Sequence, residues 1–538
     1  MKSRYLLVGA LALTMPFVGC QSADKLLDVT SPTTVSDEIF WTQEADAVLS
    51  LNGIYSSLPG WFDVMGLDGL TDNGAVNRQF DNRYVFSDGT FDPQSGYARG
   101  LWVQFFNGVA RSNILLANID RIPAGKIDAS KKPRYIAEAR FLRGVMYLQL
   151  VSLFGDVPMP LVPMTDAEAR ELTNTPAAQV YNQILADFDA AIPVLPASYT
   201  GNDVGRGTKW AALAFKARAA LYAGRYQIAA DAAKQVIDGG AFTLHPSYAQ
   251  LFSYAGENSK EIILARNYAK TAQAAGLNNN IFGEYGPPTN SAAGHVVPIR
   301  QLVDAYLMKD GLPTSTSPLF VNKPWNGPTD TLSYTSNRDP RLAATILYPG
   351  ASWDGGTFDS RPVGLSSKPE AINLGNENVS VTGFNIRKYI DLTDKADRGN
   401  GGIDMILMRY ADVLLMYAEA KFELGQNDAL ALAAFNLVRT RAGMPTVATL
   451  TQADIRLERR VELAFEGLRL FDIRRWKIAA TVMPTPVVTG IDYINASGTK
   501  VTATYPASAR QFPARAYLWP IPQSELDLNA NLKQNPGF

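Results

Sequence analysis

Cysteine and histidine are almost absent from this chain of 538 residues. Cys20 is the only cysteine, and the two histidines are His245 and His295. A single thiol cannot form an intramolecular disulfide, so packing must stabilise the fold. The histidines form no HExxH motif, and we find neither a GxSxG elbow nor a GxxxxGK[ST] phosphate loop. The sequence therefore gives no support to zinc, serine-hydrolase or nucleotide chemistry, and it predicts no cofactor.

An excess of one charge is also lacking. The chain has 50 Lys and Arg residues against 51 Asp and Glu residues. Cleavage before Cys20 would remove Lys2 and Arg4 and no acid, which gives a mature charge of about −3. A nucleic-acid-binding protein would show an excess of basic residues or a basic stripe, so the balanced charge argues against nucleic-acid binding. Apart from one N-terminal segment, no apolar run approaches the roughly 20 residues of a membrane span, which argues against a polytopic membrane protein.

The N-terminal apolar run, from Tyr5 to Val18, ends at Gly19 and Cys20. It is too short to span a membrane and has the length of the apolar part of a signal peptide. A small residue directly before a cysteine resembles a bacterial lipobox, in which cleavage frees the cysteine to carry a lipid. We therefore expect a signal peptide at 1–19 and lipidation at Cys20. The alternative is an ordinary secretory signal with an incidental thiol.

Helical patterns dominate most of the mature chain. A polar tether at 20–35 precedes a first helix near Phe40, and residues 58–99 show no period and are expected to be mostly loop. Further helices are predicted at 101–122, 134–154, 180–195, 208–223 and 226–238. Alanines face aromatic residues across the tight turn at Gly224, which is the pattern of a tetratricopeptide-like helical hairpin.

The composition changes at about residue 241. Residues 241–404 are rich in Gly, Pro, Asn and Ser and predict a long loop-rich insertion with functional content. A second hairpin follows at 405–425 and 428–443, and residues 453–476 predict one further long helix. The expected fold class is mostly α, with tetratricopeptide-like helical hairpins forming a scaffold that a long loop-rich insertion interrupts.

Six segments in order resemble the SusD/RagB family of outer-membrane nutrient-binding lipoproteins. They are FWTQEADAVLSLNGIY, YIAEARFLRGVMYLQLVSLFGDVPMPLV, GRGTKWAALAFKARAALYAG, MILMRYADVLLMYAEAKFELG, ERRVELAFEGLRLFDIRRW and YLWPIPQSELDLNANLKQNPGF. They extend over nearly the whole mature chain. The resemblance divides it into an N-terminal region at 36–240, the insertion at 241–404 as ligand face, and a C-terminal helical region at 405–538.

The resemblance implies a SusD-like protein without catalytic activity, anchored by lipid on the outer surface of the outer membrane. It implies four tetratricopeptide-like units and a partnership with a SusC-like TonB-dependent barrel transporter. The protein would bind oligosaccharide, or peptide as in some members, and deliver it for import. We expect the helical back and the closing segment to dock on the barrel, with the irregular loops facing its lumen.

Aromatic rings beside amide, carboxylate or guanidinium groups are the residues with which a non-catalytic protein holds a sugar. The two irregular regions supply such neighbourhoods, and their candidate ligand-binding residues are Trp61, Asn73, Phe80, Arg83, Tyr84, Asn280, Tyr285, Trp325 and Trp353. The alternative for each aromatic residue is that it anchors its loop in the core. Trp102, Trp210, Trp476 and Trp519 are interpreted as core residues.

Two sets of acidic residues have a spacing that can be compared with known metal-binding motifs. Glu458, Glu462 and Glu466 share a helix face, but they lack Glu-x-x-His partners, so ordinary solvated pairing with Arg459, Arg460 and Arg469 is expected instead. Asp68, Asp72 and Asn73 could ligate a calcium ion, but they do not have EF-hand spacing. The sequence therefore predicts no metal ligand, and it leaves open whether a structural calcium is bound. Asp472, Arg474 and Arg475 beside Trp476 predict a structural ion network.

Two alternatives to a nutrient-binding protein stay open. The first is a helical glycoside hydrolase or lyase on the cell surface, which would need two carboxylates flanking the scissile bond. The second is a tetratricopeptide-like scaffold that binds only proteins. Assays for new reducing ends and for glycan or peptide affinity distinguish the three.

Overall fold

The computed structural model describes residues 40–270, 276–288, 292–373, 376, 378–505 and 509–538. The predicted signal peptide at 1–19, the lipidation site Cys20 and the whole tether at 20–35 lie outside the described residues. Within the described ranges, no helix combines the length and the apolar character that a membrane crossing requires.

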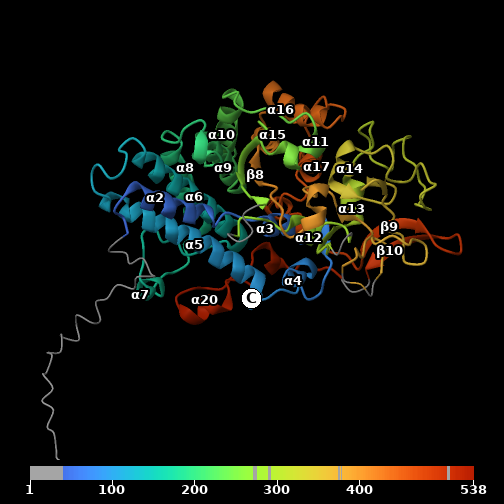
Figure 1. Cartoon of the computed structure of the whole chain (residues 1–538), viewed down its shortest axis with the longest axis horizontal. Coiled ribbons are helices and arrows are strands. Elements are labelled where there is room, and N and C mark those ends of the chain that lie inside the picture. The colour runs from blue at the N-terminus through green and yellow to red at the C-terminus, as the bar shows by residue number, and fades with distance from the viewer. Residues whose placement is uncertain (1–39, 271–275, 289–291, 374–375, 377, 506–508) are drawn as a thin grey trace, which may run out of the picture.

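Four pairs of packed helices form one side of the described molecule (Figure 1). The pairs are α2 (Glu44–Tyr55) with α5 (Gly96–Asn118), α6 (Lys132–Phe154) with α8 (Ala177–Ala191), α9 (Lys209–Tyr222) with α10 (Tyr226–Asp238), and α15 (Tyr410–Glu423) with α16 (Ala429–Arg441). Consecutive pairs also pack on one another, through α2 on α6, α8 on α9 and α10 on α15. The predicted mostly α scaffold of helical hairpins is confirmed.

The tight turn between α9 and α10 has the expected cause. Gly224 adopts a φ of 70°, a left-handed conformation that side chains rarely allow. On α9 the alanines are fully buried, and Ala212, Ala219 and Ala220 leave room for the neighbouring helices to approach closely. Thr208 caps the helix, because its side-chain oxygen accepts from the Ala211 N–H.

The predicted helix at 453–476 is wrong as one element, because it is broken into α17 (Gln452–Glu462) and α18 (Arg469–Arg475). Phe465 and Gly467 in the break adopt φ values of 60° and 72°. The Asp68 carboxylate accepts from the N–H groups of both residues, each at 3.0 Å. A buried side chain from the N-terminal region thus holds the break, which helical periodicity alone does not reveal.

The expectation that residues 58–99 are mostly loop is only partly met. The segment contains α3 (Trp61–Asp68), the short strand β1 (Gly74–Val76) and α4 (Tyr84–Asp88). β1 pairs antiparallel with β3 (Val296–Pro298), with Gly74 opposite Pro298. These elements are shorter than the window that reveals a helical period. The pairing also joins the first irregular region to the second.

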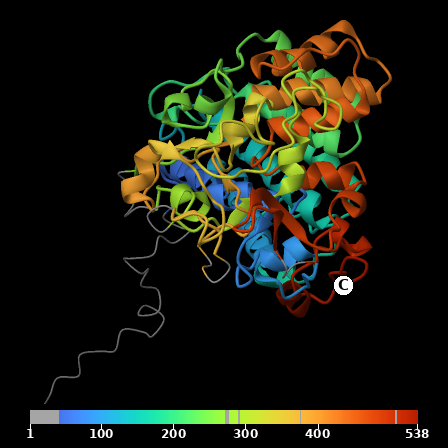
Figure 2. The same ribbon diagram turned by 90° about the vertical axis from the view of Figure 1, so that its right-hand side faces the viewer.

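Residues 241–404 form the expected loop-rich insertion, spread over the other side of the molecule (Figures 1 and 2). Its helices are α11 (Tyr248–Leu251), α12 (Ile281–Tyr285), α13 (Arg300–Ala305) and α14 (Pro340–Thr345). Its strands β2 (Ile262–Arg266), β4 (Ile346–Leu347), β5 (Ser352–Trp353), β6 (Gly356–Thr357) and β7 (Asn385–Ile386) belong, like β3, to two-stranded pairings.

The remaining elements close the fold. β8 (Met405–Arg409) pairs with β2, and β9 (Val488–Ile494) forms a hairpin with β10 (Lys500–Tyr505). Near the end of the chain, α20 (Gln523–Leu528) lies beside the helical pairs, as does the short α7 (Asp166–Ala169) (Figure 1). Trp102 and Trp519 are buried in the core as predicted, whereas Trp210 and Trp476 are only half-buried.

A buried charge network stabilises the C-terminal region, and its partners differ from those expected. Glu458 pairs with Arg341 and Arg439, and Glu462 pairs with Arg341, Arg409 and Arg441. Glu466 pairs with Arg409 and Lys388. All three glutamates are buried, so the predicted solvated pairing with Arg459, Arg460 and Arg469 is wrong. Their cations come from distant segments that no helix spacing identifies.

The same helices carry the predicted network around Asp472. Its carboxylate accepts from Arg459 at 3.0 Å and from Arg475 at 2.9 Å, and Arg475 also pairs with Glu419. Arg474 is not part of this network: its Nη2 donates to the Ala516 carbonyl at 2.8 Å. The prediction is therefore confirmed for Asp472 and Arg475.

Candidate functional site

Arg83 and Tyr285 bring the two irregular regions together. Arg83 stands directly before α4, and Tyr285 is the last residue of α12. Arg83 Nη1 donates to Tyr285 Oη at 2.7 Å across 202 residues of sequence, and Tyr285 Oη donates in turn to the Phe62 carbonyl at 2.9 Å. The rings of Trp61 and Tyr285 meet edge to face, with centroids 5.9 Å apart. Three predicted site residues thus share one neighbourhood.

The Arg83 side chain is fully buried and is held on two sides. Its Nε and Nη2 donate to the two carboxylate oxygens of Asp81 at 2.9 and 2.5 Å. Burial alone would lower the pKa of Arg83, but Tyr285 and Asp81 raise it above its ordinary value. Burial likewise opposes ionisation of Asp81, and Arg83 outweighs it, so that the pKa of Asp81 is lowered. The pair is therefore fixed and charged.

Arg83 and Asp81 line a pocket of about 470 Å³, which we call the phenylalanine pocket. Its lining includes Phe62, Phe80, Arg83, Gln104, Glu284 and His295. Phe80 is 64% exposed and Phe62 is 36% exposed. The guanidinium carbon of Arg83 lies 4.0 Å from the centre of the Phe62 ring, and this cation–π contact holds the ring in place. The pocket thus offers two accessible phenyl rings beside polar groups.

The polar groups of the phenylalanine pocket suit hydroxyl groups. Glu284 Oε2 contacts His295 Nδ1, and Asp63 also lines the pocket, where burial raises the pKa of Asp63. The Gln104 amide donates to the carbonyls of Ser57 and Leu58 and lies next to Asp63. Flat apolar faces flanked by hydrogen-bonding groups match a sugar ring, which has a C–H face and a polar edge.

Sequence reasoning missed Phe62, Gln104 and His295. Phe62 follows Trp61 directly, and nothing in the sequence distinguishes which of the two adjacent aromatic rings faces solvent. Gln104 lies on α5, which looked purely structural, and His295 stands alone in its segment. Their convergence depends on the β1–β3 pairing and on the Arg83–Tyr285 bond, which no local pattern encodes.

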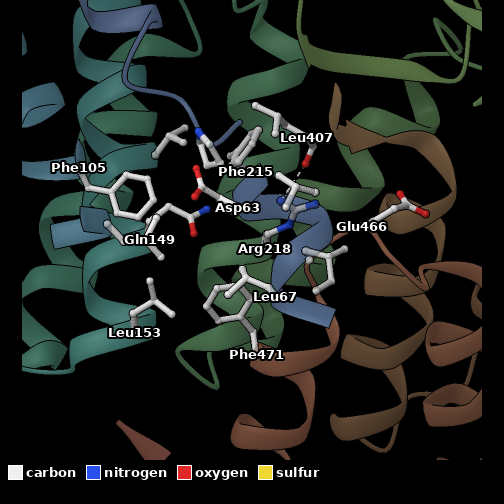
Figure 3. A pocket seen from close by; sticks show the side chains of 16 residues that line it. Asp63, Leu67, Phe105, Gln149, Leu153, Phe215, Arg218, Leu407, Glu466 and Phe471 are labelled. Carbon is white, nitrogen blue, oxygen red and sulfur yellow. Dashed lines mark hydrogen bonds between the residues drawn. The ribbon is translucent and has the colours of Figure 1, made fainter. Parts of the chain in front are cut away.

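Two other hollows are less suited to a sugar. An interior cavity of about 40 Å³ lies between α3, α6, α9 and the turn at Gly467, with Asp63, Gln149 and Arg218 around it (Figure 3). Since one water needs roughly 10–15 Å³ of such space, the cavity holds a few waters at most. A groove of about 560 Å³ between α5 and α20 is larger, but the large apolar side chains exposed in it, such as Val103, Val162 and Leu528, are aliphatic and not aromatic. Exposed polar residues, among them Asn107, Asp166 and Arg170, line it as well.

The other predicted residues lie apart from the phenylalanine pocket or beneath the surface. Asn73 is fully buried, donating to Asp68 and accepting from Arg460. Trp325 is buried and its Nε1 donates to Asp359 at 3.2 Å. Tyr84 and Asn280 are half-buried, and Asn280 Nδ2 donates to Glu284 at 3.2 Å.

Trp353 is also nearly closed off, at 9% exposure in the β5–β6 hairpin. Burial of Asn73, Trp325 and Trp353 is what anchoring of a loop requires. Ligand contact by any residue of the predicted set stays a prediction.

The acidic residues near α3 serve the fold. Asp72 pairs with Arg460 and Arg469, whereas Asp68 accepts backbone N–H groups from the break after α17. Across the residues that the structure describes, no three or more His, Cys, Asp or Glu side chains gather in a way that could hold a metal ion.

Comparison with known proteins agrees with this architecture. The sequence model of the SusD family matches residues 260–538, which is more than half of the chain. The chain belongs to the SusD family. A second family model, described as starch-binding associating with outer membrane, matches residues 51–221. The resemblance drawn from six sequence segments is confirmed.

Individual members of the SusD family align over most of the chain. SusD-like protein P25 of Formosa agariphila is 26% identical over 501 residues, which cover 86% of this chain and 89% of the relative. A SusD-like protein of Bacteroides ovatus is 24% identical over 507 residues, covering 88% and 83%. The solved structure of a SusD-like carbohydrate binding protein from Bacteroides fragilis superposes with a TM-score of 0.81 at 28% identity, covering 92% of this chain and 100% of that chain.

Proposed function

We propose that this SusD-family protein binds oligosaccharide in the phenylalanine pocket and delivers it to a SusC-like TonB-dependent barrel transporter. Lipidation at Cys20 would hold it on the outer surface of the outer membrane. The observation that carries the proposal is the pair of accessible rings, Phe62 and Phe80, fixed beside the Arg83–Asp81 pair at the meeting point of the two irregular regions.

The relatives support the class of ligand. The similar solved structure from Bacteroides fragilis is described as carbohydrate binding, and the family model that matches residues 51–221 is described as starch-binding associating with outer membrane. Those descriptions belong to other proteins. Here they agree with a pocket that combines phenyl faces with hydrogen-bonding edges.

Binding is better supported than hydrolysis by the carboxyl groups of the pocket. A glycosidase needs two carboxyl groups, one to act as acid and one as nucleophile or base. Asp81 is held by Arg83 through three side-chain hydrogen bonds, and Glu284 contacts His295. Among these three carboxyl groups, Asp63 alone has neither an ion-pair partner nor a histidine contact among the described residues. One unpaired carboxyl group fits a hydrogen-bonding role.

The ligand proposal is tested by affinity electrophoresis against a panel of plant, algal and storage polysaccharides. We expect at least one polysaccharide to retard the wild type, and Phe80→Ala to abolish most of that retardation. Leu49→Ala is the matched control, because Leu49 is 62% exposed on α2, outside the lining of the pocket. If no polysaccharide is retained, or if Phe80→Ala and Leu49→Ala behave alike, the proposed pocket is wrong.

Two further measurements test the other parts of the proposal. Steady release of new reducing ends from a bound polysaccharide would instead support the hydrolase alternative. Labelled palmitate should enter the wild-type chain in cells and should not enter Cys20→Ser. Co-purification of a barrel transporter with the wild-type protein would support the partnership, and its absence under mild extraction would count against it.

A further inference from the structure

Arg387 lies on the surface of the loop-rich insertion without a carboxylate partner among the residues that the structure describes. It directly follows β7, and its backbone N–H donates to the Thr345 carbonyl at 2.9 Å. Its Nη1 donates to the Ala343 carbonyl at 3.2 Å. The side chain is half-buried, and neither Nε nor Nη2 has an acceptor among the described residues. A guanidinium group fixed by one backbone carbonyl retains capacity for another acceptor.

A second arginine, Arg338, adds positive charge near Arg387, since both act on the Tyr348 hydroxyl. Arg338 is buried, and its guanidinium group donates to the carbonyls of Val303, Tyr306 and Tyr334. Carbonyl oxygens satisfy its hydrogen bonds but do not neutralise its charge. Burial lowers the pKa of Arg338, and Asp304 and Asp339 offset this only in part. Burial also lowers the pKa of Arg387, which only Tyr348 opposes. Both stay protonated at neutral pH.

The acidic groups of this neighbourhood are already engaged. Asp339 pairs with Arg341 at 2.7 Å, Asp304 pairs with Arg300 at 2.8 Å, and Asp354 pairs with Lys395. Among the described residues, none of these carboxylates forms an ion pair with Arg387 or Arg338. The surface around Arg387 therefore keeps a net positive charge at the described residues.

Further donors stand beside Arg387. The Tyr348 hydroxyl is near both arginines, and burial raises its pKa, so it stays protonated. The Arg387 guanidinium carbon is 6.0 Å from the centre of the Trp353 ring. Trp353 Nε1 is buried and has no acceptor among the described residues. The planar guanidinium group of Arg387 and a neighbouring hydroxyl or indole N–H that lacks an acceptor are groups that can bind an oxyanion.

We propose that Arg387, with Tyr348 beside it, binds the carboxylate or sulfate group of an acidic glycan. This inference rests on the proposed function and names a charged class of ligand for it. Strand β7 lies between Arg387 and the phenylalanine pocket. Its residue Asn385 is close to Gly294, since a Cβ built on Gly294 would lie 3.2 Å from Asn385 Nδ2. Gly294 in turn directly precedes His295, which lines the phenylalanine pocket. Arg387 is two residues beyond Asn385 along the chain, about 7 Å in extended backbone.

The test uses dextran, carboxymethyl-dextran and dextran sulfate, which share a backbone and differ in charge. We expect the two anionic polymers to bind the wild type more tightly than dextran does. Arg387→Gln should weaken their binding about tenfold or more, since one charge-assisted hydrogen bond is lost, and Arg387→Lys should restore part of it. Arg140→Gln is the control, because it removes one exposed positive charge on α6.

Fold integrity is checked separately. Unchanged thermal melting of Arg387→Gln shows that the loss is local, and Tyr348→Phe provides a second variant that should weaken anionic binding without removing a charge. Equal effects of Arg387→Gln and Arg140→Gln would overturn the inference, as would a wild type that retains no anionic polymer.

Vesicles of phosphatidylglycerol test whether Arg387 binds the phosphate group of a lipid instead of the acidic group of a glycan. Arg387-dependent binding to vesicles without binding to the polymers would overturn the glycan as ligand. If charged polymers fail while a neutral polysaccharide still binds through Phe80, the inference falls and the proposed function stands. If neutral and charged polysaccharides all fail, the proposed function falls with it.

Discussion

Gly66 on α3 leaves the space that Arg83 occupies. A Cβ built on Gly66 would lie 2.6 Å from Arg83 Nη1 and 3.3 Å from Tyr285 Oη. Real Cβ atoms do not approach a heavy atom so closely, so one of the partners would have to move. The guanidinium group cannot move freely, because Asp81 holds it with three hydrogen bonds. The absence of a side chain at Gly66 is therefore a condition for the junction beneath the phenylalanine pocket.

Gly66→Ala should therefore lower both stability and ligand affinity. Overpacking of a tight interior typically costs about 1–3 kcal/mol, and displacement of Arg83 would also tilt the Phe62 ring. Chemical unfolding and affinity electrophoresis measure the two effects. Gly100→Ala is the control for stability alone, because Gly100 is also helical and faces open space but lines the phenylalanine pocket. Only the gain of about 0.8–1 kcal/mol in stability from helix propensity is expected from it. Equal stabilisation by both substitutions would contradict the proposed role of Gly66.

Glu462 is the carboxylate with the most cationic partners in the C-terminal network. It is fully buried and pairs with Arg341, Arg409 and Arg441. Glu462→Gln leaves those cations under-compensated and should cost about 3–5 kcal/mol in the free energy of unfolding. Glu171→Gln removes an exposed carboxylate and should stay within about 0.5 kcal/mol. A cost below about 1 kcal/mol for Glu462→Gln would mean that the network is not energetically coupled.

Asp72 should make stability depend on pH under acidic conditions. Burial alone would raise the pKa of Asp72, but Arg460 and Arg469 lower it to about 2. Because the folded pKa lies below the unfolded value of 3.8, the contribution is present above about pH 4 and is lost as the pH falls through 2. The shift corresponds to about 2 kcal/mol.

Urea unfolding of the wild type and Asp72→Asn across this range isolates the effect. The wild type should be more stable at neutral pH, and the difference should shrink by about 2 kcal/mol as the pH falls from about 5 to about 2. Other groups titrate in both proteins and cancel in the difference. A difference that is constant over the range would show that Asp72 is not ionised by its arginines.

The helical scaffold could be predicted from sequence because its signals are local. Alanine-rich and amphipathic periods over 14 or 13 residues identify α9, α10, α15 and α16, and Gly224 marks a turn by its own conformational freedom. The break between α17 and α18 could not be predicted in this way. It depends on Asp68, almost 400 residues away, accepting hydrogen bonds from Phe465 and Gly467.

The candidate site shows the same division. Composition points to the two irregular regions, and to Phe80, Arg83 and Tyr285 within them, since aromatic and charged residues in loops are visible in the sequence; that any of them contacts ligand stays a prediction. The sequence could not show that Arg83 would be buried while Phe80 stays exposed. Burial is decided by long-range pairing, here by Tyr285 and by the β1–β3 ladder.

A crystal structure with the tightest oligosaccharide from the affinity panel tests the central claim most directly. The account predicts a sugar ring stacked on Phe80 or Phe62, with its hydroxyl groups within hydrogen-bond reach of the polar lining at Asp63 or Glu284. A sugar bound in the groove between α5 and α20, with the phenylalanine pocket free of ligand, would contradict it.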